Sequence, residues 1–373
     1  MRNSVGAVLG AFKVRFLKLH YPDRIGHLAL DLDCYLKEQA MAGRRVRPIA
    51  ALSGRQPANR ALLDYWRRYV TFVEDPQVCR VVEAAMRSCP GLVDDLLLYS
   101  NVTNCSARAF DVQRRWGARG PLLSLSQRDL ERGRAALTQM GVPEGAWTVC
   151  IHARSEGYSP ADERFHSHRN VDVGSYMLAV DEIVSRGGWC IRMGDATMPP
   201  LPPRRGVIDY AVSPFRSDWL DLFLCATCRL FVGCTSGLYV MAAIFGRPSA
   251  LTNMAPLDCA YSPFLADLSI PRLVAGPDGS VIPIPEAFRS GVSGFRFTEQ
   301  YTANGITQIA NTDIEILELV RQALDQQEGA RSSSPEDDAL EERFRTHFRD
   351  GAYCWPPSSR IGREFLRRYR HLI

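Results

Sequence analysis

Short apolar runs alternate with amphipathic stretches along the second half of the chain, from Trp147 onward. Apolar runs of four to eight residues between turn residues are typical of buried strands, whereas apolar positions that recur every three to four residues indicate helices. We expect strands at 147–152, 189–193, 207–210, 230–233 and 249–253, and helices at 173–186, 219–228 and 237–245. This succession predicts a mostly parallel, doubly wound sheet.

The first half of the chain shows a similar but less regular alternation. Buried strands are expected within 46–52 and 69–73, and helical patterns at 58–69 and 81–86, which together favour an α/β domain. A helix-like segment, 126–139, is followed by Gly141, Pro143 and Gly145, which interrupt the pattern. We therefore predict an N-terminal domain at 1–142 and a second domain at 143–330.

A final set of helical patterns follows the second domain. Asp313 is expected to cap a helix at 314–327, and the polar stretch 328–335 is typical of an exposed linker. Amphipathic helices are expected at 340–348 and 361–369. Residues 331–373 thus form a linker with terminal helices.

Composition narrows the class of protein. The 373 residues are 46% hydrophobic and 23% charged, which suits two globular domains. The net charge of +4 is small for this length and argues against a dedicated nucleic-acid-binding protein. Only Lys13, Lys18 and Lys37 are lysines, which leaves 42 arginines. We expect this excess to reflect codon bias in a GC-rich genome rather than phosphate binding, so only the position of an individual arginine points to a function.

Cysteine content and hydropathy indicate the cellular compartment in which the protein is expected. Eleven cysteines, an odd number, follow no secretory signal, so we expect free thiols in a reducing cytoplasm. Cys225 and Cys228 form a Cys-x-x-Cys motif inside an apolar run, which favours core positions over zinc or redox chemistry. No apolar stretch reaches the ~18 residues of a membrane span. The apolar segment 5–12, followed by Lys13, allows at most a peripheral membrane contact.

A histidine and an arginine stand at the end of the predicted strand 147–152. His152 and Arg154 alternate, so their side chains point to the same side at the carboxyl end of the strand, where doubly wound sheets bind ligands. A guanidinium group matches phosphate oxygens and keeps its charge, so Arg154 is a candidate clamp for a diphosphate. The alternative is that Arg154 pairs with a carboxylate in a structural role. His152 is either a substrate-binding or a buried structural histidine.

A second polar cluster lies between the strand 230–233 and the helix that follows it. Thr235 and Ser236 offer hydroxyl groups, Gly237 permits close approach of a phosphate, and the helix start offers free N–H groups. The alternative is a simple Ser/Thr helix cap. The cluster has no lysine and is not a Walker A loop.

The remaining strand ends and the N-terminal region add further candidates. Arg192, Gly194 and Asp195 follow the strand 189–193, and Asp195 is either a nucleoside contact or a turn residue. Near the N-terminus, His27 begins a helix-like segment, where its near-neutral pKa suits a general base; the alternative is a capping role. Asp31 is expected on a solvated helix face.

Neither acidic residues nor histidines form a recognisable metal site. Asp33 is expected on the same solvated face as Asp31, so Asp31-Leu-Asp33 is not a metal motif beside a strand end. His166 and His168 flank a single serine in a loop, which does not give the ligand spacing of a metal site. We therefore expect no metal and no other cofactor.

These motifs together resemble a family of bacterial glycosyltransferases of the GT-B type, mainly over residues 147–255. The resemblance is carried by His152-Ala-Arg154, Gly157-Tyr158, His168-Arg169-Asn170, Ile191-Arg-Met-Gly-Asp195, Ser217-Asp218, Thr235-Ser-Gly237 and Phe245-Gly-Arg-Pro248. The His-x-Arg motif is also distantly similar to fucosyltransferases, whose arginine binds the donor β-phosphate; only Arg154 matches, and their arginine doublet is absent.

The resemblance implies a fold and a donor. It implies an α/β, GT-B protein with two Rossmann-like, doubly wound domains facing across a cleft, whose terminal helix at 361–369 packs back on the N-terminal domain. The second domain would bind a nucleoside diphosphate sugar, with arginines in place of a metal. Donor-binding residues would be His152, Arg154, Tyr158, Arg192, Gly194, Asp195, Thr235, Ser236 and Gly237, and Arg24, Gly26, His168 and Arg169 would line the acceptor side or the cleft.

The leading functional hypothesis is sugar transfer to a hydroxyl or amine acceptor, in natural-product or cell-surface glycan synthesis. His27 is the preferred catalytic base, with Glu156 in reserve, and direct displacement would invert the anomeric centre. One alternative is a nucleotide-sugar epimerase or hydrolase on the same fold. Another is a non-catalytic nucleotide-sugar-binding protein.

Overall fold

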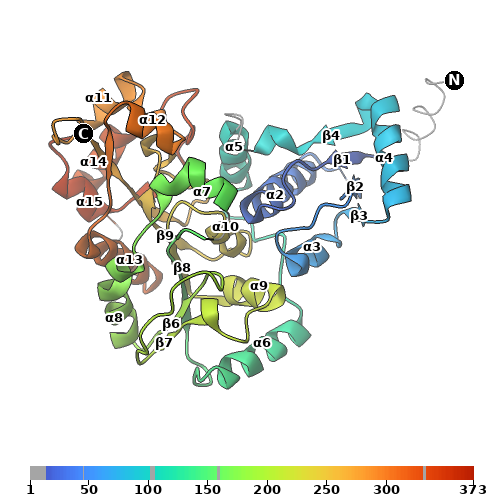
Figure 1. The fold of residues 1–373 in the computed structure, drawn as a ribbon, viewed down its shortest axis with the longest axis horizontal. Helices are drawn as coiled ribbons and strands as arrows, with labels where there is room; N and C mark the ends of the chain where they lie inside the picture. Colours follow the sequence, from blue (N-terminus) through green and yellow to red (C-terminus); the bar gives the residue numbers. More distant parts are fainter. Residues whose placement is uncertain (1–13, 45, 101–105, 158–159, 331–332) are drawn as a thin grey trace.

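The chain folds around two separate parallel sheets (Figure 1). The computed structural model describes residues 14–44, 46–100, 106–157, 160–330 and 333–373. The first sheet has the order β3-β2-β1-β4, with β1 at Phe16–Lys18, β2 at Ile49–Ala51, β3 at Thr71–Val73 and β4 at Val93–Asp95. Each strand has only three residues, which explains why the apolar signal of the first half is weak.

The second sheet has seven parallel strands in the order β13-β10-β9-β8-β5-β6-β7. The strands are β5 (Thr148–His152), β6 (Trp189–Arg192), β7 (Val207–Ile208), β8 (Leu230–Gly233), β9 (Ser249–Met254), β10 (Leu268–Pro271) and β13 (Arg360–Ile361). All residues of β5, β8 and β9 are buried, as the continuous apolar runs predict. From β5 the chain extends the sheet first toward β7 and then, from β8, in the opposite direction. This is the classic doubly wound order, with its switch point between β5 and β8.

Helices cover both sheets. Around the first sheet lie α2 (Ile25–Met41), α3 (Arg60–Trp66), α4 (Pro76–Ser88) and α5 (Ser106–Trp116). Around the second lie α6 (Gln127–Gln139), α7 (Pro160–His166), α8 (Met177–Ser185), α9 (Asp218–Thr227), α10 (Leu238–Ala243), α11 (Ile284–Arg289), α12 (Thr298–Ala303), α13 (Asp313–Gln327), α14 (Pro335–Arg345) and α15 (Arg363–Arg368). A short antiparallel pair, β11 (Leu273–Ala275) and β12 (Thr307–Ile309), completes the fold. The predicted α/β class with two Rossmann-like sheets is confirmed.

Side-chain caps start several of these helices where polar residues precede an apolar pattern. Ser217 accepts a hydrogen bond from the Leu220 amide and so caps the start of α9. For α13 the cap is Thr312, whose hydroxyl accepts from the Glu315 amide, rather than the predicted Asp313. Glu315 in turn accepts from the Thr312 amide, so the two residues form a capping box.

Two parts of the chain pack differently from the sequence-based expectation. Helix α6, inside the range 1–142, packs against α9 of the second unit: the Trp219 indole donates to Asp129 at 3.1 Å, and Gly133 lies directly on the Phe223 ring. Figure 1 shows α6 beneath α9, away from the first sheet.

The C-terminal segment corrects a second expectation. Strand β13 joins the edge of the seven-stranded sheet beside β10, and α15 packs on α13 and α14. The terminal helix therefore does not pack back on the N-terminal domain. Phe365 and Leu366 account for this placement, because they bury their side chains in the core of the second sheet.

One hydrophobic cluster joins the two units. It runs from Leu17 and Trp66 in the first unit to Cys150 and Phe231 in the second without interruption. Cys225 and Cys228 belong to it, and all ten described cysteines are buried free thiols. Among the described helices, none combines the length and apolar character needed to cross a membrane. The segment 5–12 lies outside the described residues.

Candidate functional site

The switch point between β5 and β8 brings together the two polar clusters that the sequence singles out. The Arg154 amide donates to Cys234 Sγ at 3.2 Å, and Ser236 Oγ hydrogen-bonds with His152 Nδ1 at 3.2 Å. Both contacts arise because β5 and β8 are adjacent and parallel, so that residues after their carboxyl ends meet. This edge is where doubly wound folds bind ligands.

His152 is buried and neutral. Its burial lowers the pKa to about 4, with Arg192 and Arg154 acting in the same direction and Asp195 opposing them. Only 9% of the residue is exposed, and Nδ1 is occupied by Ser236. The geometry matches the buried-histidine alternative.

Arg154 is held by its own loop. Its Nη1 contacts Glu163 Oε2 at 3.3 Å, the His166 carbonyl at 3.1 Å and the side-chain oxygen of Asn170. Asn170 also donates to Glu163 at 2.5 Å. Arg154 therefore has the carboxylate partner that the structural alternative requires.

Arg272, which was not predicted from the sequence, lies in a more unusual environment than Arg154. It follows β10 directly, is only 7% exposed, and donates to the carbonyls of His168 and Asn170, both at 2.6 Å, and to Gln308 Oε1 at 3.2 Å. Within the described ranges, no carboxylate lies within ion-pair distance of it, and its Nε lacks a hydrogen-bond partner. A buried guanidinium group with neutral partners alone is costly, so a bound anion would offset that cost. Its position at the end of a strand is the sequence signal that could have identified it.

Arg154, Arg169 and Arg272, which we call the basic cluster, surround the loop after β8. Burial raises the pKa of the Cys234 thiol, and all three arginines act against that rise. Burial also lowers the pKa of His168 to about 3, helped by Arg169, His166, Arg272 and Arg154. The charges of the three arginines, which act on both groups, make the carboxyl ends of β5, β8 and β10 electropositive.

The N-terminus of α2 reaches this edge from the first unit. A Cβ atom on Gly26 would lie 3.0 Å from Gly237 Cα, and one on Gly237 would lie 2.6 Å from the Gly26 nitrogen. Real Cβ contacts are not that short, so each glycine permits the close approach of α2 and α10. The lack of a side chain at Gly237, expected to admit a phosphate, thus admits the neighbouring helix.

His27 and Asp31 form a hydrogen-bonded pair one turn apart on α2. His27 Nδ1 lies 3.1 Å from Asp31 Oδ2 and 3.3 Å from Ser100 Oγ. In the part of the chain that the structure describes, Nε2 has no hydrogen-bond partner. If Nδ1 carries the proton shared with Asp31, Nε2 is left as an acceptor, which is the arrangement of an oriented general base.

The burial of Asp31 overturns its expected placement on a solvated face. Asp31 is 5% exposed; burial raises its pKa, and the hydrogen bond from His27 lowers it. Asp33 is fully buried, pairs with Lys37 at 2.7 Å and accepts from Gln113 at 2.7 Å. Both faces of α2 are covered, because α5 and α10 pack on it. The four-residue spacing of His27 and Asp31 was the signal that could have revealed the pair.

The other predicted residues are dispersed or already bonded. Arg192 pairs with Asp209 at 2.9 Å, and Asp195 accepts from the Thr197 amide at 2.9 Å, which makes it a turn residue. The Thr235 hydroxyl accepts from the Ala255 amide at 2.8 Å.

The loop residues show a similar picture. His168 hydrogen-bonds with Thr298 at 3.1 Å, and Glu156 is exposed. Gly194 packs against Met198, and the guanidinium carbon of Arg24 lies 5.9 Å from the ring centre of Tyr21. Tyr158 lies outside the described residues.

Within the described ranges, no three His, Cys, Asp or Glu side chains converge as a metal site would require.

The fold defines an α/β protein whose second unit is built on a doubly wound parallel sheet. Comparison of the sequence with protein-family profiles and with curated proteins finds no match. Among solved structures, the chain is similar to a family 9 glycosyl transferase from Veillonella parvula, at 8% identity and a TM-score of 0.38, with 64% of this chain and 79% of that chain covered.

Two further solved structures are similar at 12% identity, each over 64% of this chain. One is the iron-containing dodecameric glycosyltransferase TibC from enterotoxigenic E. coli, with a TM-score of 0.38 and 57% of that chain covered. The other is the E. coli heptosyltransferase WaaC with ADP-2-deoxy-2-fluoro heptose, with a TM-score of 0.33 and 88% of that chain covered.

Proposed function

We propose that the protein transfers a sugar from a nucleoside diphosphate sugar to a hydroxyl or amine acceptor. The observation that carries the proposal is the His27–Asp31 pair, held by the Gly26–Gly237 contact at the carboxyl edge of the second sheet. An imidazole with Nδ1 anchored to a carboxylate and Nε2 without a partner is suited to remove an acceptor proton.

The basic cluster supports an anionic donor. Arg272 is buried without a carboxylate, and a diphosphate placed beside it would supply the missing negative charge. As the bond between the anomeric carbon and the diphosphate oxygen breaks, negative charge grows on the leaving group, and preorganised arginines stabilise that charge. The proposed reaction draws on these arginines in place of a metal.

The proposed transfer needs one catalytic base. The acceptor oxygen or nitrogen bonds to the anomeric carbon, its proton passes to His27 Nε2, and the electron pair of the breaking bond leaves with the diphosphate. A single displacement of this kind inverts the anomeric configuration. Arg24 and Gly26, at the start of α2, would then lie on the acceptor side.

The test begins with donor binding. The purified protein is screened by thermal shift against UDP, GDP, dTDP and CMP, because a ligand that binds only the folded state raises the unfolding temperature. The Arg272→Gln variant should lose most of the shift, whereas Arg289→Gln, at an exposed position at the end of α11, should keep it. Equal shifts in both variants would remove the basic cluster from the donor site.

The second stage measures turnover. With the matching nucleotide sugar, His27→Ala should lower kcat by about 10²–10⁴-fold while leaving nucleotide binding intact. The matched surface control is His371→Ala, an exposed residue near the C-terminus. Product analysis with and without acceptor separates transfer from epimerisation or hydrolysis, and nucleotide binding without any turnover would identify a non-catalytic protein.

The proposed function also suits a particular cellular compartment. The described cysteines are buried as free thiols, which fits a reducing cytoplasm where nucleotide sugars would be available.

A further inference from the structure

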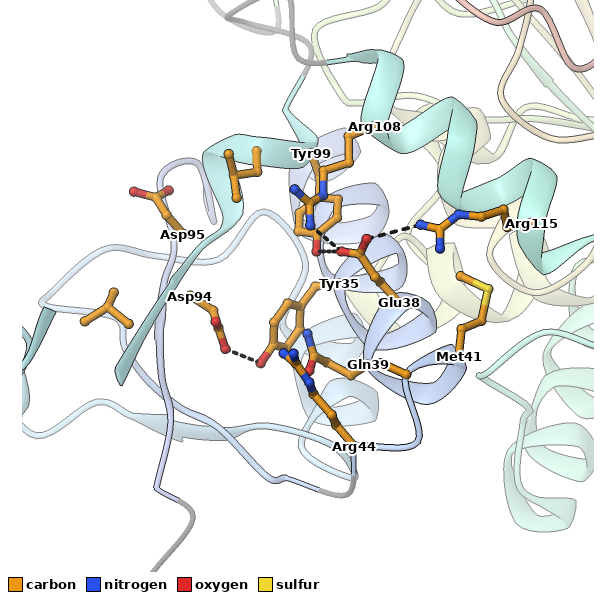
Figure 2. Close-up of a pocket in the computed structure, with 13 residues that line it drawn as sticks. Tyr35, Glu38, Gln39, Met41, Arg44, Asp94, Asp95, Tyr99, Arg108 and Arg115 are labelled. Carbon is orange, nitrogen blue, oxygen red and sulfur yellow. Dashed lines mark hydrogen bonds and ion pairs between the residues drawn. The ribbon is translucent and has the colours of Figure 1, made fainter. Parts of the chain in front are cut away.

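A polar pocket of about 480 Å³ lies in the first unit, apart from the edge described above. It opens between α2, β4 and α5, beside the edge strand of the four-stranded sheet (Figure 2). Glu38 and His27 lie on the same helix eleven residues apart, about 16 Å at the usual rise per residue. The pocket is therefore separate from the proposed catalytic base.

Two arginines of α5 converge on one carboxylate in this pocket. Arg108 and Arg115 are two turns apart and contact Glu38 at 2.7 and 3.2 Å. The Tyr99 hydroxyl also donates to Glu38, so both oxygens of this carboxylate have partners within the protein. Each guanidinium group offers five N–H donors, more than these contacts use, and both side chains are more than 40% exposed.

Arg44 adds a third cation on the opposite side of the opening. It lies beside Tyr35 and Gln39 in Figure 2 and is exposed, and among the described residues its guanidinium group has no hydrogen-bond or ion-pair partner. Its charge lowers the pKa of Tyr35, against a larger rise caused by burial. Arg44 is thus a cation at the pocket with no carboxylate of its own.

The charges around the pocket do not cancel. The lining itself holds three carboxylates, Glu38, Asp94 and Asp95, and three cations, Arg44, Arg108 and Arg115. Ion pairs connect these to Arg15, Lys18, Asp111 and Arg114, which lie outside the lining, so the whole network has four carboxylates and six cations. Asp94 is matched by Arg15 and Asp95 by Lys18. Once every carboxylate has one cation, two positive charges remain. A phosphate monoester carries about two negative charges near neutral pH, which matches this excess.

Apolar and aromatic side chains form the rest of the lining. Met41, Val93 and Leu98 line the pocket together with Tyr35 and Tyr99, whose rings meet edge to face at 6.4 Å. Pockets of 300–1,000 Å³ that combine such a lining with a few placed charges are typical of small-molecule sites. We propose that this pocket binds a small organic phosphate monoester, with its phosphate on Arg44, Arg108 and Arg115 and its body against the tyrosines.

The test uses phenyl phosphate as the probe, with calorimetric titration of the full-length protein. Phenyl phosphate should bind with a stoichiometry of one at the pocket, at least fivefold more tightly than benzoate, and phenol should not bind. The Arg44→Gln variant should weaken phenyl phosphate binding about fivefold and Arg108→Gln at least tenfold. Arg44→Gln removes no side-chain hydrogen bond or ion pair to any described residue, and the position is exposed, so the variant should fold.

The matched control is Arg114→Gln, on the same helix but paired with Asp111 outside the pocket lining. It should bind the probe as the wild type does. Unchanged binding in both Arg44→Gln and Arg108→Gln would place the site elsewhere and overturn the proposal. Binding of benzoate or phenol as tight as that of phenyl phosphate would also overturn the proposal. It would likewise be overturned if phenyl phosphate did not bind at ten times the concentration that saturates a site with a millimolar Kd.

Discussion

Gly237 Cα lies 3.0 Å from the position that a Cβ atom on Gly26 would occupy, so the first turn of α2 rests on the start of α10 without any intervening side chain. This contact joins the two parallel-sheet units beside the candidate site. The contact brings His27, the residue after Gly26, to the edge where Ser236 and Gly237 lie.

We predict that Gly237→Ala lowers the free energy of unfolding by about 1–3 kcal/mol, because the added methyl group overlaps the Gly26 backbone. Urea denaturation measures this change. Gly91→Ala is the control, since nothing lies within 4 Å of its Cβ position and its φ is ordinary. A Gly237→Ala variant as stable as Gly91→Ala would show that the two helices separate in solution.

We predict that Asp31→Asn lowers kcat by about 10²–10⁴-fold, since the amide no longer holds the imidazole of His27 in the tautomer that leaves Nε2 unprotonated. The kcat–pH profile should also differ from that of the wild type, because the substitution replaces the titratable carboxyl group that contacts His27 with a neutral amide. Asp23→Asn, at an exposed position before α2, should leave both quantities unchanged. A loss of kcat without a displaced pH profile would indicate a purely structural role for Asp31.

Replacing Lys37 by Ala should cost about 3–5 kcal/mol of stability, because it leaves the buried carboxylate of Asp33 without its cation. The double variant Asp33→Ala/Lys37→Ala should lose less than the sum of the two single losses, since it leaves no unpaired charge. A double-mutant cycle in urea provides the measurement. Additive losses would mean that the two charges do not interact.

Stability should depend on pH through Asp267. Burial raises the pKa of this carboxyl to about 7, so the folded protein keeps a proton that the unfolded chain releases near pH 4. The resulting stabilisation is complete below pH ~4 and is lost as the pH rises through 7. Asp267→Asn retains an acceptor for the Ser249 amide, at 2.8 Å in the wild type.

The wild type should therefore lose about 1–3 kcal/mol relative to Asp267→Asn between pH 5 and 8.5. Thermal unfolding at a series of pH values compares the two proteins. Parallel stability curves would show that Asp267 is ionised throughout this range.

Because the proposed reaction uses arginines to stabilise the leaving diphosphate, EDTA should leave kcat within about twofold of its untreated value. Turnover in a metal-free buffer, with and without added Mg²⁺, checks this expectation. An activity that EDTA abolishes and Mg²⁺ restores would assign the diphosphate charge to a metal ion.

The fold was more predictable than the site. Strands such as Leu230–Gly233 are buried on both faces, so their apolar runs mark them without knowledge of the tertiary structure. The site depends on contacts between distant segments. Arg272 could not be singled out from the sequence, because only the folded structure shows that it lacks a carboxylate partner among the described residues. Asp31 was misplaced because a helix covered by neighbours on both sides does not show one apolar face in its sequence.

The position of α6 bears on how the chain can be recombined with others. A chimera joined at residue 142 would separate Gly133 from the Phe223 ring that covers it, and would leave the Trp219 indole without its partner Asp129. A junction near residue 120, between α5 and α6, would keep each sheet with the helices that pack on it. The module that can be exchanged as a unit therefore includes α6 as well as the second sheet, and it begins one helix before β5.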